Sequence, residues 1–308
     1  VYYVVTLRHS SDAFAADLAE ALAIISAIDH EVLSYKMPRL VVPLVALADE
    51  GAWSWTHIVS NSHFWDLLVV AVGQSESTEV VFTFIEEIVR VDTEVSAENV
   101  LEVVKVLGEL ASIGSLGAQL EQDKAAVYEK FKAKFDKPTA QVKGDEVVRT
   151  MKTTVARSVR ALEMIQALES HAALGSDIWY AFVYQLSQQS INPCRAIRDR
   201  AFEYYTQLLN MGVAGKLAWE PLLIKGVCPL MDALGQADVL KTDPKGMPKT
   251  QVALAQLLGG LVLDHKDSIK EEVWSKVQAF LDTTGVQFEK DEMKEAVSIE
   301  NNDKEIEA

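Results

Sequence analysis

The stretch INPCRAIRDRAFEYYTQLLN, residues 191–210, predicts a helix that buries one face. Asn192 is a favourable N-cap residue, and Pro193 suits the first helical position, where no amide partner is required. Apolar side chains then recur at intervals of four, four and three residues on one stripe, namely Ile197, Ala201, Tyr205 and Leu208. Arg198 follows the first of them, so its side chain can reach over a neighbouring turn.

The cap, the proline, the aliphatic–Arg pair and the small residue together are typical of the opening of a HEAT-type helical repeat: Asn192, Pro193, Ile197, Arg198 and Ala201. Helices of such repeats pair and stack on their neighbours. This stretch therefore indicates a scaffold of further helix pairs and predicts a stacking role for the five residues, not a chemical one.

The composition supports an almost wholly helical protein. Among 308 residues, 49% are apolar and 24% charged, which is ordinary for a folded chain, while the 15 glycines and 8 prolines are few. No stretch of any length alternates apolar and polar residues with the period of a strand. We expect an all-α fold, an α-solenoid of HEAT/armadillo-like helical repeats.

Helical periodicity also suggests how the chain is divided. We expect an N-terminal part of the solenoid over 1–135, a flexible break over 136–145 (DKPTAQVKGD), a C-terminal part over 146–288 and an acidic, frayed tail over 289–308. Helices are predicted over 31–47, which Pro38 and Pro43 should bend or split into short pieces, and over 146–171, 219–234, 248–264 and 268–282. The chain opens without Met on apolar VYYVVTL, so we expect a fragment of a longer polypeptide.

The charge balance excludes one class of partner. The formal net charge of −16, from 29 basic and 45 acidic residues, argues against a nucleic-acid-binding surface and disfavours broad adhesion to anionic lipid. One local exception is a basic segment with two phenylalanines, a candidate membrane or partner contact made of Lys130, Phe131, Lys132, Lys134 and Phe135. No apolar run reaches the roughly 18 residues of a membrane-spanning helix.

The sequence lacks several common catalytic and cofactor-binding motifs. The sequence has no phosphate-binding loop, no GxGxxG and no GxSxG. His57 and His63 lie six residues apart near Asp66, which is a poor spacing for metal ligands, so an interhelix or surface role is expected. Cys194 and Cys228 also lack metal-ligand spacing and predict buried, reduced thiols, as in the cytosol or nucleus. We expect no cofactor, no metal and no catalytic residue.

The order of segments in the C-terminal half carries a family resemblance. DIWYAFVYQLSQQSINPCRAIRDRAFEYYTQLL is followed by a Trp-led helix ending in GVCPLMDAL, and then by TDPKGMPKTQVALAQLLGGLVLDH. Over about 177–265 this order resembles the region downstream of the catalytic domain in large Golgi Arf guanine-nucleotide exchange factors of the Gea/GNOM class. The chain departs from that pattern at Gln251, where Arg is usual, and at Cys228, where Phe is common.

The resemblance implies that this portion of the protein has a noncatalytic function. The family's exchange domain, with its glutamate finger, has no counterpart in these 308 residues, so we expect no enzyme here. The family implies roles in membrane recruitment, regulation and dimer or partner contacts during Golgi vesicle trafficking, at the cytoplasmic face of the Golgi. The implied partners are an Arf-family GTPase and a homodimer through the longer protein, and Golgi membranes or Golgi-bound proteins.

Two other functions are compatible with the sequence. A generic HEAT-repeat adaptor, of the transport-receptor or phosphatase-scaffold type, would have no link to Arf. An all-α enzyme would require polar residues that converge in a closed pocket, for example around His57 and His63.

Overall fold

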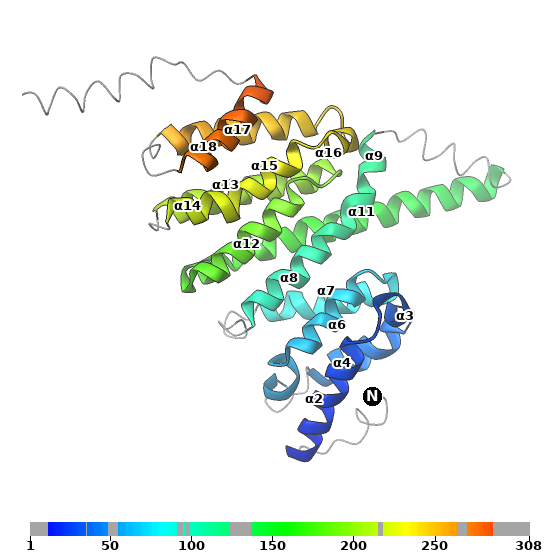
Figure 1. Cartoon of the computed structure of the whole chain (residues 1–308). Coiled ribbons are helices and arrows are strands. Elements are labelled where there is room, and N and C mark those ends of the chain that lie inside the picture. The colour runs from blue at the N-terminus through cyan, green and yellow to red at the C-terminus, as the bar shows by residue number, and fades with distance from the viewer. Residues whose placement is uncertain are drawn as a thin grey trace, which may run out of the picture. The chain divides into compact units, whose positions relative to one another are not determined.

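In the computed structural model of the chain (Figure 1), residues 12–34, 36–48, 55–90, 95, 99–122, 137–214, 218–263 and 270–285 are described. Every regular element within these ranges is a helix, and none of them contains a strand. The all-α prediction is therefore confirmed. The predicted tail at 289–308 and the basic segment at 130–135 lie outside the described residues.

The chain forms two compact units, residues 1–205 and 206–308. The boundary falls within α13 (Arg195–Ala214) and not at the predicted break over 136–145. That prediction is wrong for residues 137–145, which are the first turns of α11 (Lys137–Ala167), the long green helix of Figure 1. Pro138 lies in the first turn, where its missing amide costs nothing, and Gly144 alone weakens a helix by only about 1 kcal/mol.

The first part of unit 1 is a stack of short helices around α6. Its elements are α2 (Asp12–Ser26), α3 (His30–Ser34), α4 (Met37–Ala48), the π-helix η1 (Trp55–Val59), α6 (Ser62–Val72) and α7 (Ser75–Arg90). The helix α6 packs against α2, α4 and α7 and buries Phe64, Leu67, Leu68 and Ala71. The stretch 31–47 is split into α3 and α4, one of the two outcomes predicted for it, and Pro43 stays inside α4.

The second part of unit 1 is organised around α8. Its elements are α8 (Val100–Ser112), the 3-10 helix η2 (Ile113–Gly117), α9 (Ala118–Gln122), α11, the 3-10 helix η3 (Glu169–Leu174), α12 (Ser176–Gln189) and the start of α13. The helix α8 packs against α6 and α7 on the N-terminal side and against α11 and α12 on the C-terminal side. Contacts of this kind, between elements near in sequence, are those of stacked helical repeats, as predicted.

Unit 2 contains a helix interrupted by proline and two longer helices. Its elements are α14 (Trp219–Pro221), the π-helix η4 (Leu222–Val227), α15 (Cys228–Leu234), α16 (Ala237–Thr242), α17 (Met247–Leu263) and α18 (Glu271–Thr284). Pro229 cannot donate a backbone hydrogen bond, and the Cys228 amide bonds to the carbonyl five residues back, at Leu223. The short α16 has no buried residue, so it left no apolar pattern to predict it.

Candidate functional site

The turn before α13 holds the first two residues of the predicted repeat signature. The Asn192 side chain accepts a hydrogen bond from the Cys194 amide (3.0 Å) and donates one to the Gln189 side chain (3.0 Å). These bonds close an Asx-type turn, so α13 begins at Arg195 and not at Pro193 as predicted. Gln189 in turn donates to the Ser112 hydroxyl at 2.7 Å, which joins this turn to α8.

The cap of α13 comes from a different helix. Glu121 of α9 accepts hydrogen bonds from the amides of Arg195 (2.7 Å) and Ala196 (3.2 Å). Those amides have no partner within the helix, and a carboxylate is favourable there because the helix dipole is positive at its N-terminus. The Cys194 thiol also points at this carboxylate, with 3.4 Å between Sγ and Oε1. Sequence periodicity could not find this contact, because 74 residues separate Glu121 from Arg195.

Arg198 is a buried structural residue. Only 1% of its surface is exposed, and its Nη1 donates to the carbonyls of Asn192 (3.0 Å) and Pro193 (3.4 Å). The guanidinium thus satisfies backbone groups of the turn that precedes its own helix. Ile197 and Ala201 are fully buried beside it, so the stripe predicted for this helix is present.

Three glycines of α8 and η2 let the neighbouring helices approach closely. A Cβ at Gly114 would lie 2.4 Å from Ile197 Cδ1 and 2.6 Å from Ser158 Oγ. A Cβ at Gly117 would lie 2.2 Å from a Val155 methyl group. A Cβ at Gly108 would lie 1.9 Å from the Gln185 side-chain oxygen, which is the end of a flexible side chain. The junction of α8, α11, α12 and α13 therefore depends on residues without side chains.

Cys194 is a poorly reactive thiol, and the His63 ring contacts a serine and lies near an aspartate. Burial, with help from the Glu121 carboxylate, raises the pKa of the Cys194 thiol to about 11, so the reactive thiolate is scarce at neutral pH. The His63 ring lies 2.9 Å from the Ser26 hydroxyl and 3.9 Å from Asp66. Throughout the described part of the chain, no three His, Cys, Asp or Glu side chains gather as a metal site would require.

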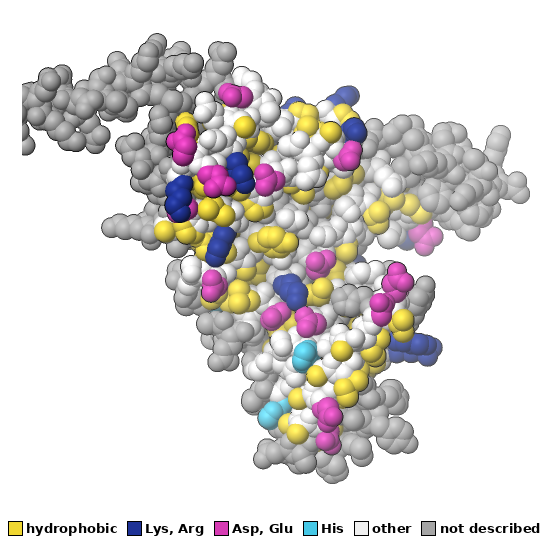
Figure 2. Space-filling model, in the orientation of Figure 1, with side chains coloured by type: hydrophobic (Ala, Val, Ile, Leu, Met, Phe, Trp, Pro, Cys, Tyr) yellow, Lys and Arg dark blue, Asp and Glu magenta, His cyan; other side chains and the backbone are white. Residues whose placement is uncertain are grey.

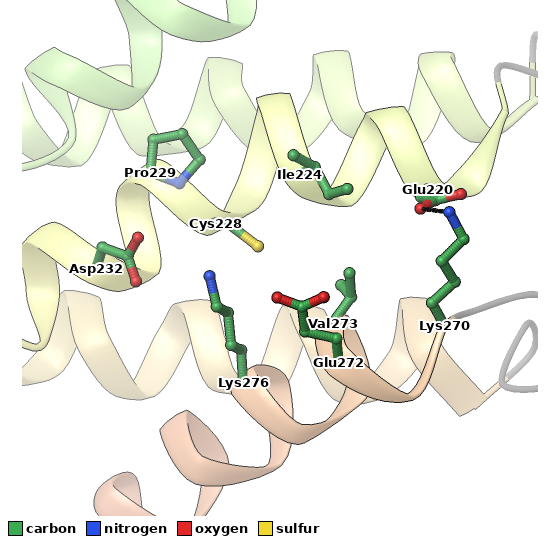
Figure 3. Close-up of a pocket in the computed structure, with 9 residues that line it drawn as sticks. All are labelled: Glu220, Ile224, Cys228, Pro229, Asp232, Lys270, Glu272, Val273 and Lys276. Atoms are coloured by element: carbon green, nitrogen blue, oxygen red, sulfur yellow. Dashed lines mark ion pairs between the residues drawn. The ribbon is translucent and has the colours of Figure 1, made fainter.

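A groove of about 350 Å³ crosses the surface of unit 2 (Figure 3). One wall comes from α14, η4 and α15 and carries side chains at every fourth residue: Glu220, Ile224, Cys228 and Asp232. The other wall is the start of α18, with Lys270, Glu272, Val273 and Lys276. An ion pair between Lys270 and Glu220 bridges the two walls at one end. Burial and the Asp232 charge raise the pKa of the Cys228 thiol.

Charged side chains of both signs lie at the surface of the described residues. On the face shown in Figure 2, acidic and basic side chains are interspersed. An exposed ion pair between Arg160 and Glu86 (2.9 Å) joins α11 to α7. Of the helices described, none combines the length and apolar character needed to cross a membrane.

Fold and site thus define a helical-repeat region whose buried polar groups hold helices together. Residues 179–300 match a family model described as "GBF1-like, tetratrico peptide repeat region". ARF guanine-nucleotide exchange factor 2 of Saccharomyces cerevisiae is 25% identical over 182 residues, which cover 57% of this chain and 12% of the yeast protein. The resemblance to a region of large Arf exchange factors is therefore confirmed. The description of the family model calls the repeats of that family tetratrico peptide repeats.

Proposed function

We propose that this chain is a noncatalytic, regulatory scaffold region of a large Arf guanine-nucleotide exchange factor. The observation that carries the proposal is the match of residues 179–300 to the GBF1-like repeat region. The contacts of Asn192, Arg198 and Glu121 support it, because they join neighbouring helices and the turn between them, as a stacked helical repeat requires.

The proposal includes a place and partners. The longer protein acts on an Arf-family GTPase as a peripheral protein on the cytoplasmic face of Golgi membranes, in vesicle-mediated transport. This region contributes recruitment, regulation and partner or homodimer contacts. The name of the yeast relative supports the Arf partner, and that relative is much longer than the segment it shares with this chain.

Nucleotide exchange on Arf tests the proposal. The isolated 308-residue chain should leave the rate of fluorescent-GDP release from Arf unchanged. The longer protein should accelerate release in solution with or without this region, whereas its recruitment to Golgi membranes in cells should fall when the region is deleted. Faster release by the isolated chain would make it catalytic. If sequencing of the parent gene found no exchange domain upstream, the generic HEAT-type adaptor would replace the Arf proposal.

The basic segment remains a separate proposal for membrane or partner contact. It consists of Lys130, Phe131, Lys132, Lys134 and Phe135. Because the whole chain carries a net charge of −16, we expect weak flotation with anionic liposomes. Strong flotation that disappears at high salt, and that is lost when the three lysines become glutamine, would assign membrane binding to this segment.

A further inference from the structure

The groove of unit 2 is lined by both apolar and charged side chains. Ile224 lies in the π-helix η4 and is 45% exposed, although its side chain is large and apolar. Cys228 of the same wall and Val273 of the opposite wall also line the groove (Figure 3) and are largely buried, so the three residues form its apolar part. An exposed apolar side chain in a groove of this size is suited to receive a side chain of a partner.

The charges along the groove favour a partner of positive charge. Three acids and two lysines line it, and Lys270 is already paired with Glu220. Asp232, Glu272 and Lys276 remain, and no ion pair joins them to another residue in the described ranges. A basic partner would therefore meet two carboxylates, whereas an acidic partner would meet a single ammonium group. The net charge of −16 attracts a basic partner from a distance as well.

We infer that this groove is a docking site for a basic, amphipathic peptide segment of another protein. An apolar side chain of the segment packs on Ile224 and Val273, and a Lys or Arg side chain pairs with Asp232 and Glu272. A second copy of the chain is disfavoured, because a two-fold contact would place this acidic lining against itself. An anionic membrane is disfavoured by the same charges. The inference deepens the partner-binding role proposed above, but its test does not involve Arf.

Fluorescence polarisation with the full 308-residue chain tests the inference. The probe is a fluorescein-labelled helical peptide of about 14 residues, roughly four turns, with leucine on one face and lysine on its flanks. It should bind saturably, and the same peptide with glutamate in place of lysine should bind about tenfold more weakly. Equal binding of the two peptides, or no saturable binding of the lysine peptide, would overturn the inference.

Matched variants locate the binding. Ile224→Asp should weaken the lysine peptide about tenfold or more, because it removes the apolar anchor. Ile24→Asp makes the same change at an isoleucine of α2 that is 60% exposed, and should leave binding unchanged. Asp232→Asn with Glu272→Gln should weaken binding and reduce its salt dependence. Equal effects of the two isoleucine variants would refute docking in the groove.

Two further measurements separate other occupants. Bound peptide should slow alkylation of Cys228, which lines the groove, and leave Cys194 unaffected. In analytical sedimentation, the original chain and the Ile224→Asp variant should have the same oligomeric state. Flotation with phosphatidylserine vesicles should also be the same for both. A dimer or vesicle binding lost in this variant would assign the groove to a second copy or to a membrane, against the inference.

Discussion

Gly114→Ala tests whether the junction between α8, α11 and α13 depends on close backbone approach. The new Cβ would lie 2.4 Å from Ile197 Cδ1, 2.6 Å from Ser158 Oγ and 2.8 Å from Ser158 Cβ. Both neighbours are fully buried, and Ser158 is also fixed by its hydrogen bond to the Leu110 carbonyl (2.8 Å). Neither can move aside without disturbing its own packing, so the methyl group must force the helices apart.

The magnitude follows from two opposing effects. Overpacking a core typically costs about 1–3 kcal/mol, while replacing glycine by alanine in a helical position returns about 0.5–1 kcal/mol. We expect the free energy of unfolding to fall by about 1–2 kcal/mol. Gly73→Ala is a matched control in the same unit, because its Cβ would come no closer than 3.7 Å to a neighbour and its φ of −68° suits alanine. That variant should be neutral or stabilised by up to about 1 kcal/mol.

Urea unfolding followed by circular dichroism measures both variants. A double-mutant cycle adds the decisive comparison, since Ile197→Val removes the methyl group nearest to the new Cβ. Ile197→Val alone should cost about 0.5–1.5 kcal/mol, and clearly less in the Gly114→Ala protein. If Gly114→Ala were as stable as Gly73→Ala, or if the two substitutions at the junction were additive, close approach would not govern this junction.

Four further predictions concern groups at or near the same helices. Arg198→Ala should lower the free energy of unfolding by about 1–3 kcal/mol, because the buried Asn192 carbonyl and the half-buried Pro193 carbonyl lose their donor. Exposed Arg200→Ala should leave the melting temperature unchanged. Glu121→Ala should cost about 0.5–2 kcal/mol and speed amide exchange at the start of α13, and normal exchange there would contradict the cap. Burial raises the pKa of Glu102, so the folded state holds this proton more tightly than the unfolded state and stability falls as pH rises above about 4.3. Glu102→Gln should therefore raise the melting temperature slightly at pH 7 and make no difference at pH 3; an equal effect at both pH values would exclude titration as the cause. Iodoacetamide at pH 7.5 should modify Cys194 only after denaturation, as mass spectrometry can show, because the pKa of this thiol is raised to about 11; rapid labelling of the native chain would disprove its burial.

Periodic burial is the part of the fold that the sequence predicts well. The stripe that contains Ile197 and Ala201 is buried, and so is the stripe of Val273, Val277, Phe280 and Leu281 in α18. In both cases one face of the helix packs against the core along its whole length, so the spacing of apolar residues predicts which face is buried. The helical-repeat fold and the resemblance to Arf exchange factors depend on such stripes and on their order.

Contacts between segments that are distant in the sequence produce no periodic pattern from which they could be predicted. Gly108, Gly114 and Gly117 carry no side chain that could indicate a contact, because the side chains that fill the space beside them belong to other segments of the chain. Asn192 was expected to cap its own helix, yet it closes a turn while Glu121 provides the cap. The groove is equally non-local, since its walls begin about fifty residues apart, near Glu220 and Lys270.

The capping of α13 by Glu121, a residue of another helix, also affects the order of folding. A helix that carries its own cap can form its first turn from local contacts alone. The first turn of α13, by contrast, is capped by a carboxylate that lies 74 residues earlier in the chain. Closing a loop of that length costs entropy before the bond is made. The start of α13 should therefore be completed only when α9 has reached it, which ties the integrity of that one turn to the docking of the whole intervening segment.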